Sequence, residues 1–227
     1  TAANDAAYVP LHSTVTNVII LNAACELMVY GGAEIKANGT TGFANGAGGS
    51  MALTAPNITT QSGSLIQANG NNGPGGTISV SGDIINLAGT IEASGSAGGS
   101  FALTADVLVV GNAAVIQTNG QAGPGGTITL NLNQDTQINQ ALISANGDAD
   151  GGSIRIVSNA GNLNIQNALI QTNGSNGRGG SIAVSAYNNV NISNSEIDAV
   201  GYTQGGIILI GNDAESRTLP FALSLTV

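Results

Sequence analysis

The stretch NGPGGTISVSGDIINLAGTIEASG, residues Asn72–Gly95, contains one full copy of the pattern that decides the fold of this 227-residue chain. It holds a Gly-Gly pair, two apolar residues separated by one position, and then Ile91, which Ala93 follows two residues later and Gly95 four residues later. An Ile followed by Ala or Thr and then Gly occurs seven times, at Ile35, Ile66, Ile91, Ile116, Ile143, Ile170 and Ile197. A repeat of 25 to 31 residues with no room for a helix predicts a β-solenoid.

Two large apolar residues follow each Gly-Gly pair, with one small or polar residue between them in most copies. Alternation with a period of two predicts a strand that buries one face. The buried ladder that we expect at the centre of the chain consists of Ile78, Val80, Phe101, Leu103, Ile128, Leu130, Ile154, Ile156, Ile182 and Val184.

Two further strands are expected in each repeat. One begins at the repeated Ile, and a less regular one precedes it, as in Asp83–Leu87 and Val107–Val110. Three strands per coil, stacked in parallel on the next coil, make an all-β parallel β-helix of about seven to eight coils of about 26 residues. Right-handed coiling is expected from the handedness of parallel crossovers. We expect residues 1–30 to form an N-terminal cap or first coil, residues 31–211 the solenoid repeats and residues 212–227 a C-terminal strand.

An Asn precedes the Gly in most copies of the repeat, as in Asn119–Gly120. Asn-Gly reaches positive φ at low cost, so a tight turn is expected at this corner. Stacked Asn side chains are also expected to hydrogen-bond from coil to coil.

Charged residues make up only 7% of the chain, and 13 acidic against four basic residues give a net charge of −9. Nucleic-acid binding needs clustered Lys and Arg, so we expect no nucleic-acid partner. No apolar run is long enough to cross a bilayer, so no membrane insertion is expected. The single cysteine, Cys25, cannot form an internal disulfide and is expected to be a small buried apolar residue.

The residues favour a protein without catalytic activity. The one His, His12, precedes the repeats and has no evident partner. Carboxylates leave a polysaccharide-cleaving site open: Asp148 and Asp150 lie in one loop, and Glu196 and Asp198 flank Ile197 and point outward roughly two coils away. Glycoside cleavage needs carboxyl groups about 5–10 Å apart, and two coils already separate equivalent positions by about 10 Å. Against that alternative, the chain has no Trp, four Tyr and three Phe to stack on sugars. We expect no catalytic residue and no cofactor.

The loop GDADGG contains Asp148 and Asp150, which are a weak candidate for Ca²⁺ binding. A polar turn explains the same residues, and no metal site is expected.

The two ends of the chain depart from the repeat. Four apolar residues alternate in the last ten positions, namely Phe221, Leu223, Leu225 and Val227. Near the other end, Val18 and Ile20 lie in the strongly β-forming stretch Val15–Leu21. Open strand edges pair with other chains unless they are covered. Both interpretations stay open: these strands cap the solenoid, or they connect one subunit to the next.

The segments NGPGGTISVSGDIINLAGTIEASG (Asn72–Gly95) and NGRGGSIAVSAYNNVNISNSEIDAVG (Asn176–Gly201) resemble the repeats of filamentous-haemagglutinin-type exoproteins of bacteria. The resemblance covers about residues 31–211. It implies a secreted right-handed β-helix that acts at the cell surface as an adhesin or a biofilm matrix scaffold. We therefore expect an extracellular structural protein that packs against itself, end to end or laterally, with host or matrix glycans as further partners. A polysaccharide-binding or polysaccharide-cleaving β-helix protein is the alternative.

Overall fold

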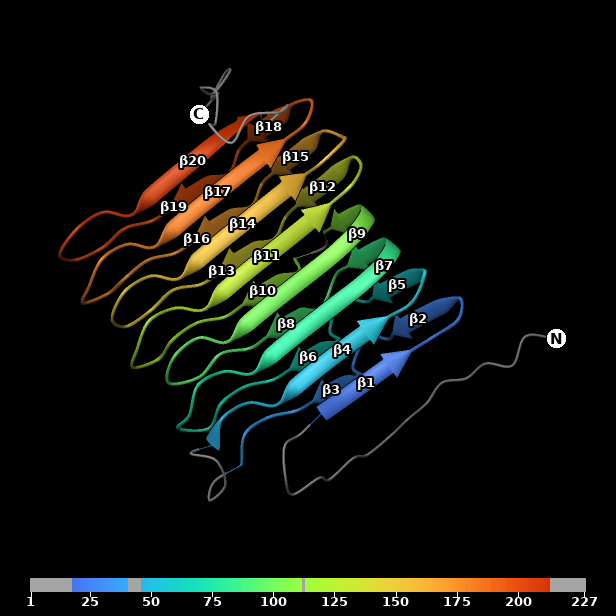
Figure 1. Ribbon diagram of the computed structural model, residues 1–227, viewed down its shortest axis with the longest axis horizontal. Helices are drawn as coiled ribbons and strands as arrows, with labels where there is room; N and C mark the ends of the chain where they lie inside the picture. Colours follow the sequence, from blue (N-terminus) through green and yellow to red (C-terminus); the bar gives the residue numbers. More distant parts are fainter. Residues whose placement is uncertain (1–17, 41–45, 112, 213–227) are drawn as a thin grey trace.

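The computed structural model describes residues 18–40, 46–111 and 113–212. These residues form twenty strands, all paired in parallel, in a β-solenoid of seven complete coils and one further strand (Figure 1). The predicted fold class is confirmed. In the pairing of successive coils, Ile116 lies opposite Ile91 and Ile143, as the repeat requires.

The solenoid has three faces. The first is the row of strands that follow the Gly-Gly pairs: β1 (Val18–Asn22), β4 (Ser50–Thr54), β7 (Thr77–Leu87), β9 (Ser100–Val110), β11 (Thr127–Leu132), β14 (Ser153–Ser158), β17 (Ser181–Ala186) and β20 (Ile207–Asn212). The second consists of the later halves of β7 and β9 together with β2 (Glu26–Val29), β5 (Asn57–Thr60), β12 (Thr136–Asn139), β15 (Leu163–Gln166) and β18 (Val190–Ser193). The third is a separate seven-stranded sheet of β3 (Glu34–Lys36), β6 (Leu65–Gln67), β8 (Thr90–Glu92), β10 (Val115–Gln117), β13 (Leu142–Ser144), β16 (Leu169–Gln171) and β19 (Glu196–Asp198).

Two of the coils have two strands in place of three. β7 and β9 are each 11 residues long and turn the corner between the first and second faces without a break. The separate strands expected at Asp83–Leu87 and Val107–Val110 are therefore the ends of longer strands. In the next coil, the polar stretch Asn133–Asp135 interrupts the strand at the same corner. The continuous strands join the first two faces into one 13-stranded sheet.

The buried ladder lies where the sequence predicts it. Phe101 pairs in register with Ile78 and Ile128, and Leu103 pairs with Val80 and Leu130. All ten predicted members have at most 3% of their surface exposed. The Ile residues of the third face are buried in the inner coils, whereas Ile35 and Ile197 are only partly buried in the two outermost coils. The core is therefore one continuous column along the solenoid.

The Gly-Gly corner needs glycine because the backbones of neighbouring coils approach it closely. The N–H of Gly126 donates to the carbonyl of Thr118 in its own coil at 2.7 Å, which pinches the loop between them closed. A Cβ on Gly126 would collide with the carbonyl oxygen of Gly99 in the preceding coil. A Cβ on Gly125 would collide with the carbonyl oxygen of Ala145 in the following coil. Both positions require glycine because the chain passes between two neighbouring backbones.

The expected positive φ does not occur at the repeated Asn-Gly pairs, although Gly46 and Asn72, in the loops that follow two of these pairs, have it. The described non-glycine residues with positive φ are Asn72, Ala113, Gln140, Asn167 and Asn194, and the last four lie at the corner between the second and third faces. The Asn-Gly corner is instead a wider loop whose Asn side chains bond between coils, as expected. Asn146 N–H donates to Asn119 Oδ1 at 2.8 Å, and the same contact recurs from Asn38 to Val200.

Cys25 is exposed, so the expectation of a buried cysteine is wrong. It lies in the turn between β1 and β2, where the chain has left the inward-facing positions of a strand. Among the residues described, no helix is long and apolar enough to cross a membrane.

Candidate functional site

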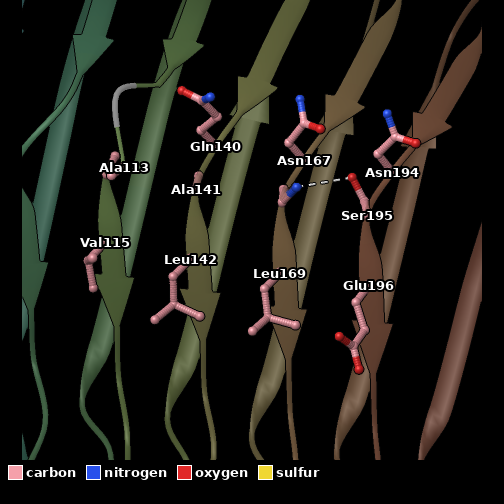
Figure 2. Close-up of a pocket in the computed structure, with 12 residues that line it drawn as sticks. Ala113, Val115, Gln140, Ala141, Leu142, Asn167, Leu169, Asn194, Ser195 and Glu196 are labelled. Carbon is pink, nitrogen blue, oxygen red and sulfur yellow. Dashed lines mark hydrogen bonds between the residues drawn. The ribbon is translucent and has the colours of Figure 1, made fainter.

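A groove of about 860 Å³ runs along the outside of the solenoid at the corner between the second and third faces. It crosses four successive coils, at the starts of β10, β13, β16 and β19 (Figure 2). Each coil contributes three consecutive residues: one to the upper wall, one to the floor and one to the lower wall. The groove therefore repeats its chemistry at every coil, about 4.8 Å apart.

Small residues form the floor. Ala114, Ala141 and Ala168 are almost fully buried. In the last of these coils a serine takes the place of the alanine, and the Oγ of Ser195 accepts the N–H of Ala168 at 3.1 Å. Small side chains here leave room for a ligand between the walls.

The upper wall is a row of side chains on a left-handed backbone. φ is +59° at Ala113, +53° at Gln140, +51° at Asn167 and +48° at Asn194. The first two coils have glycine at this position, Gly32 and Gly63, both with φ of +82°. L-residues in this conformation cost roughly 1–2 kcal/mol relative to the right-handed region, with Asn the best tolerated. The later coils therefore carry amide side chains at a position where glycine is the less strained choice.

The amides of this wall are largely free to bind a ligand. Asn167 Nδ2 donates to Asn139 Oδ1 at 3.1 Å. The side chains of Gln140 and Asn194 form no hydrogen bond with any other described residue and are exposed. In Figure 2 the three amides form one row above the floor.

The lower wall is apolar over three coils and ends on a carboxylate. Val115, Leu142 and Leu169 are in register and partly buried, and Glu196 follows them on the last coil. Figure 2 shows these side chains in a row below the amides. The groove thus has a hydrogen-bonding wall, an aliphatic wall and one charged end.

The groove was not predicted from the sequence. The sequence feature that marks the groove is one position in the corner before the third-face strands. This position is Gly32 or Gly63 in the first two coils and Ala113, Gln140, Asn167 or Asn194 in the four coils of the groove. This feature identifies the groove only when the corner with positive φ is known, and the sequence predicts positive φ at the Asn-Gly corner instead.

The Ca²⁺ candidates lie on the opposite side of the third face. Asp148 Oδ1 accepts Asn176 Nδ2 at 2.9 Å, and Asp150 Oδ1 accepts the N–H of Arg178 at 2.7 Å. Asp150 also lies 3.6 Å from the Arg178 guanidinium. The part of the chain that the structure describes has no group of three or more His, Cys, Asp or Glu side chains placed to hold a metal ion. Protein groups contact both carboxylates, which favours the polar-turn interpretation over the weak Ca²⁺ candidate.

Glu196 and Asp198, two of the carboxylates considered for sugar cleavage, lie on one strand but differ in exposure. Glu196 is exposed at the end of the groove, whereas Asp198 is partly buried on the same strand. His12 lies outside the described residues.

The terminal residues divide into two groups. Val18 and Ile20 point outward from β1, with 50% and 63% of their surface exposed, and pair in register with Ser50 and Ala52. Ile207 and Leu209 point outward from β20 at the other end of the first face. Phe221, Leu223, Leu225 and Val227 lie outside the described residues. Both described ends of the first face therefore carry exposed apolar side chains.

Comparison with protein-family models, curated proteins and solved structures finds no match to this chain. The resemblance to filamentous-haemagglutinin-type repeats therefore stays an expectation.

Proposed function

We propose that this chain is a non-catalytic extracellular structural protein, a subunit or segment of a bacterial surface fibre, matrix scaffold or adhesin. It acts by presenting a rigid, repetitive surface and by packing against copies of itself. The resemblance to filamentous-haemagglutinin-type repeats supports a secreted protein at the cell surface.

One observation carries the proposal: among the described residues, the last strand, β20, has a neighbouring strand on one side only. β20 pairs with β17 and with no other described strand, and no described strand of the second or third face accompanies it. Ile208 continues the buried column of Phe101 and Ile182, yet 41% of its surface is exposed. An unpaired edge beside an uncovered core favours addition of another strand. The alternating apolar residues of Thr218–Val227 are the candidate for that strand, within one subunit or between two.

Electron microscopy of the purified chain tests the proposal. Filaments with an axial repeat of about 35–40 Å, the height of seven or eight stacked coils, are the expected result. Deleting Thr218–Val227 should leave short rods if this segment connects subunits. Short rods of the intact chain at all concentrations would contradict end-to-end assembly.

The alternative function, polysaccharide binding, is favoured by a separate observation, the amide-lined groove.

A further inference from the structure

We propose that the groove at the corner between the second and third faces binds one uncharged, extended polysaccharide chain, which lies parallel to the solenoid axis with about one sugar unit per coil. This inference does not depend on assembly through the ends of the solenoid. Its test and the filament test can fail independently.

The two walls match the two kinds of surface on a sugar ring. The amides of Gln140, Asn167 and Asn194 offer both donors and acceptors, which suits hydroxyl groups that also donate and accept. Leu142 and Leu169 offer aliphatic surface to the C–H groups of the ring. Sites for small polar ligands commonly combine an apolar lining with a few placed polar groups.

The axial repeat favours a glycan over a peptide. The walls repeat at each coil, about 4.8 Å, whereas an extended peptide presents side chains to one face about every 6.8 Å. A peptide therefore falls out of step with the amides within two coils. A pyranose unit of an extended glycan is close in length to one coil, so the chain stays in step with the walls at about one sugar per coil.

The backbone of the groove argues against a peptide for a second reason. Peptides are commonly captured by adding a strand to an open sheet edge. Here the lower-wall residues already donate to the coil before: Leu142 N–H to Ala114 O and Leu169 N–H to Ala141 O, both at 2.9 Å. Three of the four strands that line the groove, β10, β13 and β16, are interior strands of the third-face sheet. The fourth, β19, is an edge strand, but a ligand that lies along the solenoid axis crosses this strand and does not pair with it.

The negative charge of the groove and of the whole chain favours an uncharged glycan over an anionic one. Glu196 is the one charged residue that lines the groove. The chain as a whole carries a net charge of −9. Uronate-rich or sulfated chains would be repelled, and no lining Lys or Arg offsets that repulsion.

The backbone conformation points the same way. Glycine serves this corner in the first two coils, and the groove crosses coils in which residues with side chains replace it. Strained positions persist where the surrounding structure holds them and often mark functional sites. The strain also makes a clean test possible, because removing an amide by substitution with glycine does not threaten the fold.

Affinity electrophoresis of the 227-residue chain tests the proposal, in native gels cast with hydroxyethyl cellulose, xyloglucan or galactomannan. Gels with alginate and polygalacturonate are the anionic comparison. The variant is Gln140→Gly/Asn167→Gly/Asn194→Gly, and the matched control is Gln121→Gly, an exposed amide of the Asn-Gly corner that does not line the groove. Thermal unfolding of each variant verifies the fold.

We expect retardation in at least one neutral gel, weakened about tenfold or more in the triple variant and unchanged in Gln121→Gly. The proposal is overturned by free migration in all three neutral gels, by retardation in anionic gels alone, or by equal retardation of wild type and triple variant. Screening an array of extended peptides covers the other class of ligand. Peptide binding that needs the same three amides, without glycan binding, would also overturn it.

Discussion

The side-chain oxygen Oδ1 of Asn146 accepts the backbone N–H of Asn173, one coil further along, at 2.7 Å. Asn146 N–H in turn donates to Asn119 Oδ1, so Asn146 donates a hydrogen bond to the coil before and accepts one from the coil after. Ser94 performs the same role through its hydroxyl, with a longer contact of 3.1 Å to Asn119 N–H. The ladder ends at Val200, whose side chain has no polar atom to continue it. These side chains thereby add to the backbone hydrogen bonds that join successive coils at the same corner, such as Gly147 N–H to Asn173 O at 2.8 Å.

Replacing Asn146 by Ala should destabilise the fold by ~1–3 kcal/mol, because the partly buried N–H of Asn173 loses its acceptor. Asn146→Ser should recover part of that loss, as Ser94 shows. Chemical denaturation followed by circular dichroism measures both. The control is Asn176→Ala, whose amide makes an exposed contact with Asp148. An equal decrease in the free energy of unfolding of Asn146→Ala and Asn176→Ala would show that the Asn ladder stabilises the fold no more than an exposed side-chain contact does.

Two buried hydroxyls weaken the core. Thr118 Oγ1 and Thr172 Oγ1 have no hydrogen-bond partner, although both residues are fully buried. Neighbouring coils have Ala93 and Ala145 at this position. Thr118→Val should therefore stabilise the protein by ~1–2 kcal/mol, because it removes an unpaired polar group and keeps the shape.

Thr136→Val is the matched control for that prediction. Thr136 is equally buried, but its hydroxyl donates to Gln134 O at 3.4 Å. This variant should lose stability or leave it unchanged. The argument fails if both substitutions shift the unfolding midpoint in the same direction by the same amount.

Gln140→Gly should raise the free energy of unfolding by ~0.5–1 kcal/mol. The left-handed backbone costs an L-residue roughly 1–2 kcal/mol, and the entropy lost by glycine returns part of that gain. The reverse change, Gly63→Ala, should cost ~1–2 kcal/mol. Its Cβ would have room, with the nearest described atom 3.7 Å away, so the cost isolates conformation from crowding. Thermal unfolding of the pair is decisive, and a less stable Gln140→Gly would remove the strain argument for the groove.

Gly125 and Gly205 occupy the same place in their repeats but have different surroundings. A Cβ on Gly125 would strike the Ala145 carbonyl of the next coil, whereas a Cβ on Gly205 has no described atom within 4 Å. Gly125→Ala should therefore destabilise the fold by at least ~1–3 kcal/mol. Gly205→Ala should change stability by less than ~0.5 kcal/mol. Urea titration of the two variants compares them, and similar losses would mean that the glycines act through something other than the neighbouring coil.

The repeat was enough to predict the coils, because burial every second residue leaves a plain signature in positions such as Phe101 and Leu103. The corners were harder. Asn-Gly is the usual marker of a positive-φ turn, yet this fold uses Asn for its side-chain oxygen and Gly for close approach. The positive-φ corner between the second and third faces has glycine or asparagine in some coils but Ala113 and Gln140 in others, so no single turn signature repeats there. Since the groove is built on that corner, it could be found only once the backbone was known.

Leu209 and Ala102 share one outward column of the first face, and this allows end-to-end and lateral association to be separated. Leu209 lies on the terminal strand β20 with 45% of its surface exposed, and Ala102 lies on β9 in the middle of the solenoid. Charged side chains on edge strands disfavour pairing with another chain. Leu209→Lys should therefore raise the concentration needed for filament formation about tenfold, equivalent to roughly 1.4 kcal/mol per junction.

Ala102→Lys should leave that concentration unchanged if subunits join at their ends, because the substitution is remote from both. Light scattering against concentration, with electron microscopy of the same samples, provides the measurement. Both variants should keep the wild-type unfolding midpoint, since both side chains are exposed. Filaments that Ala102→Lys blocks and Leu209→Lys spares would identify lateral packing of the flat first face as the contact, and end-to-end joining through β20 would be wrong.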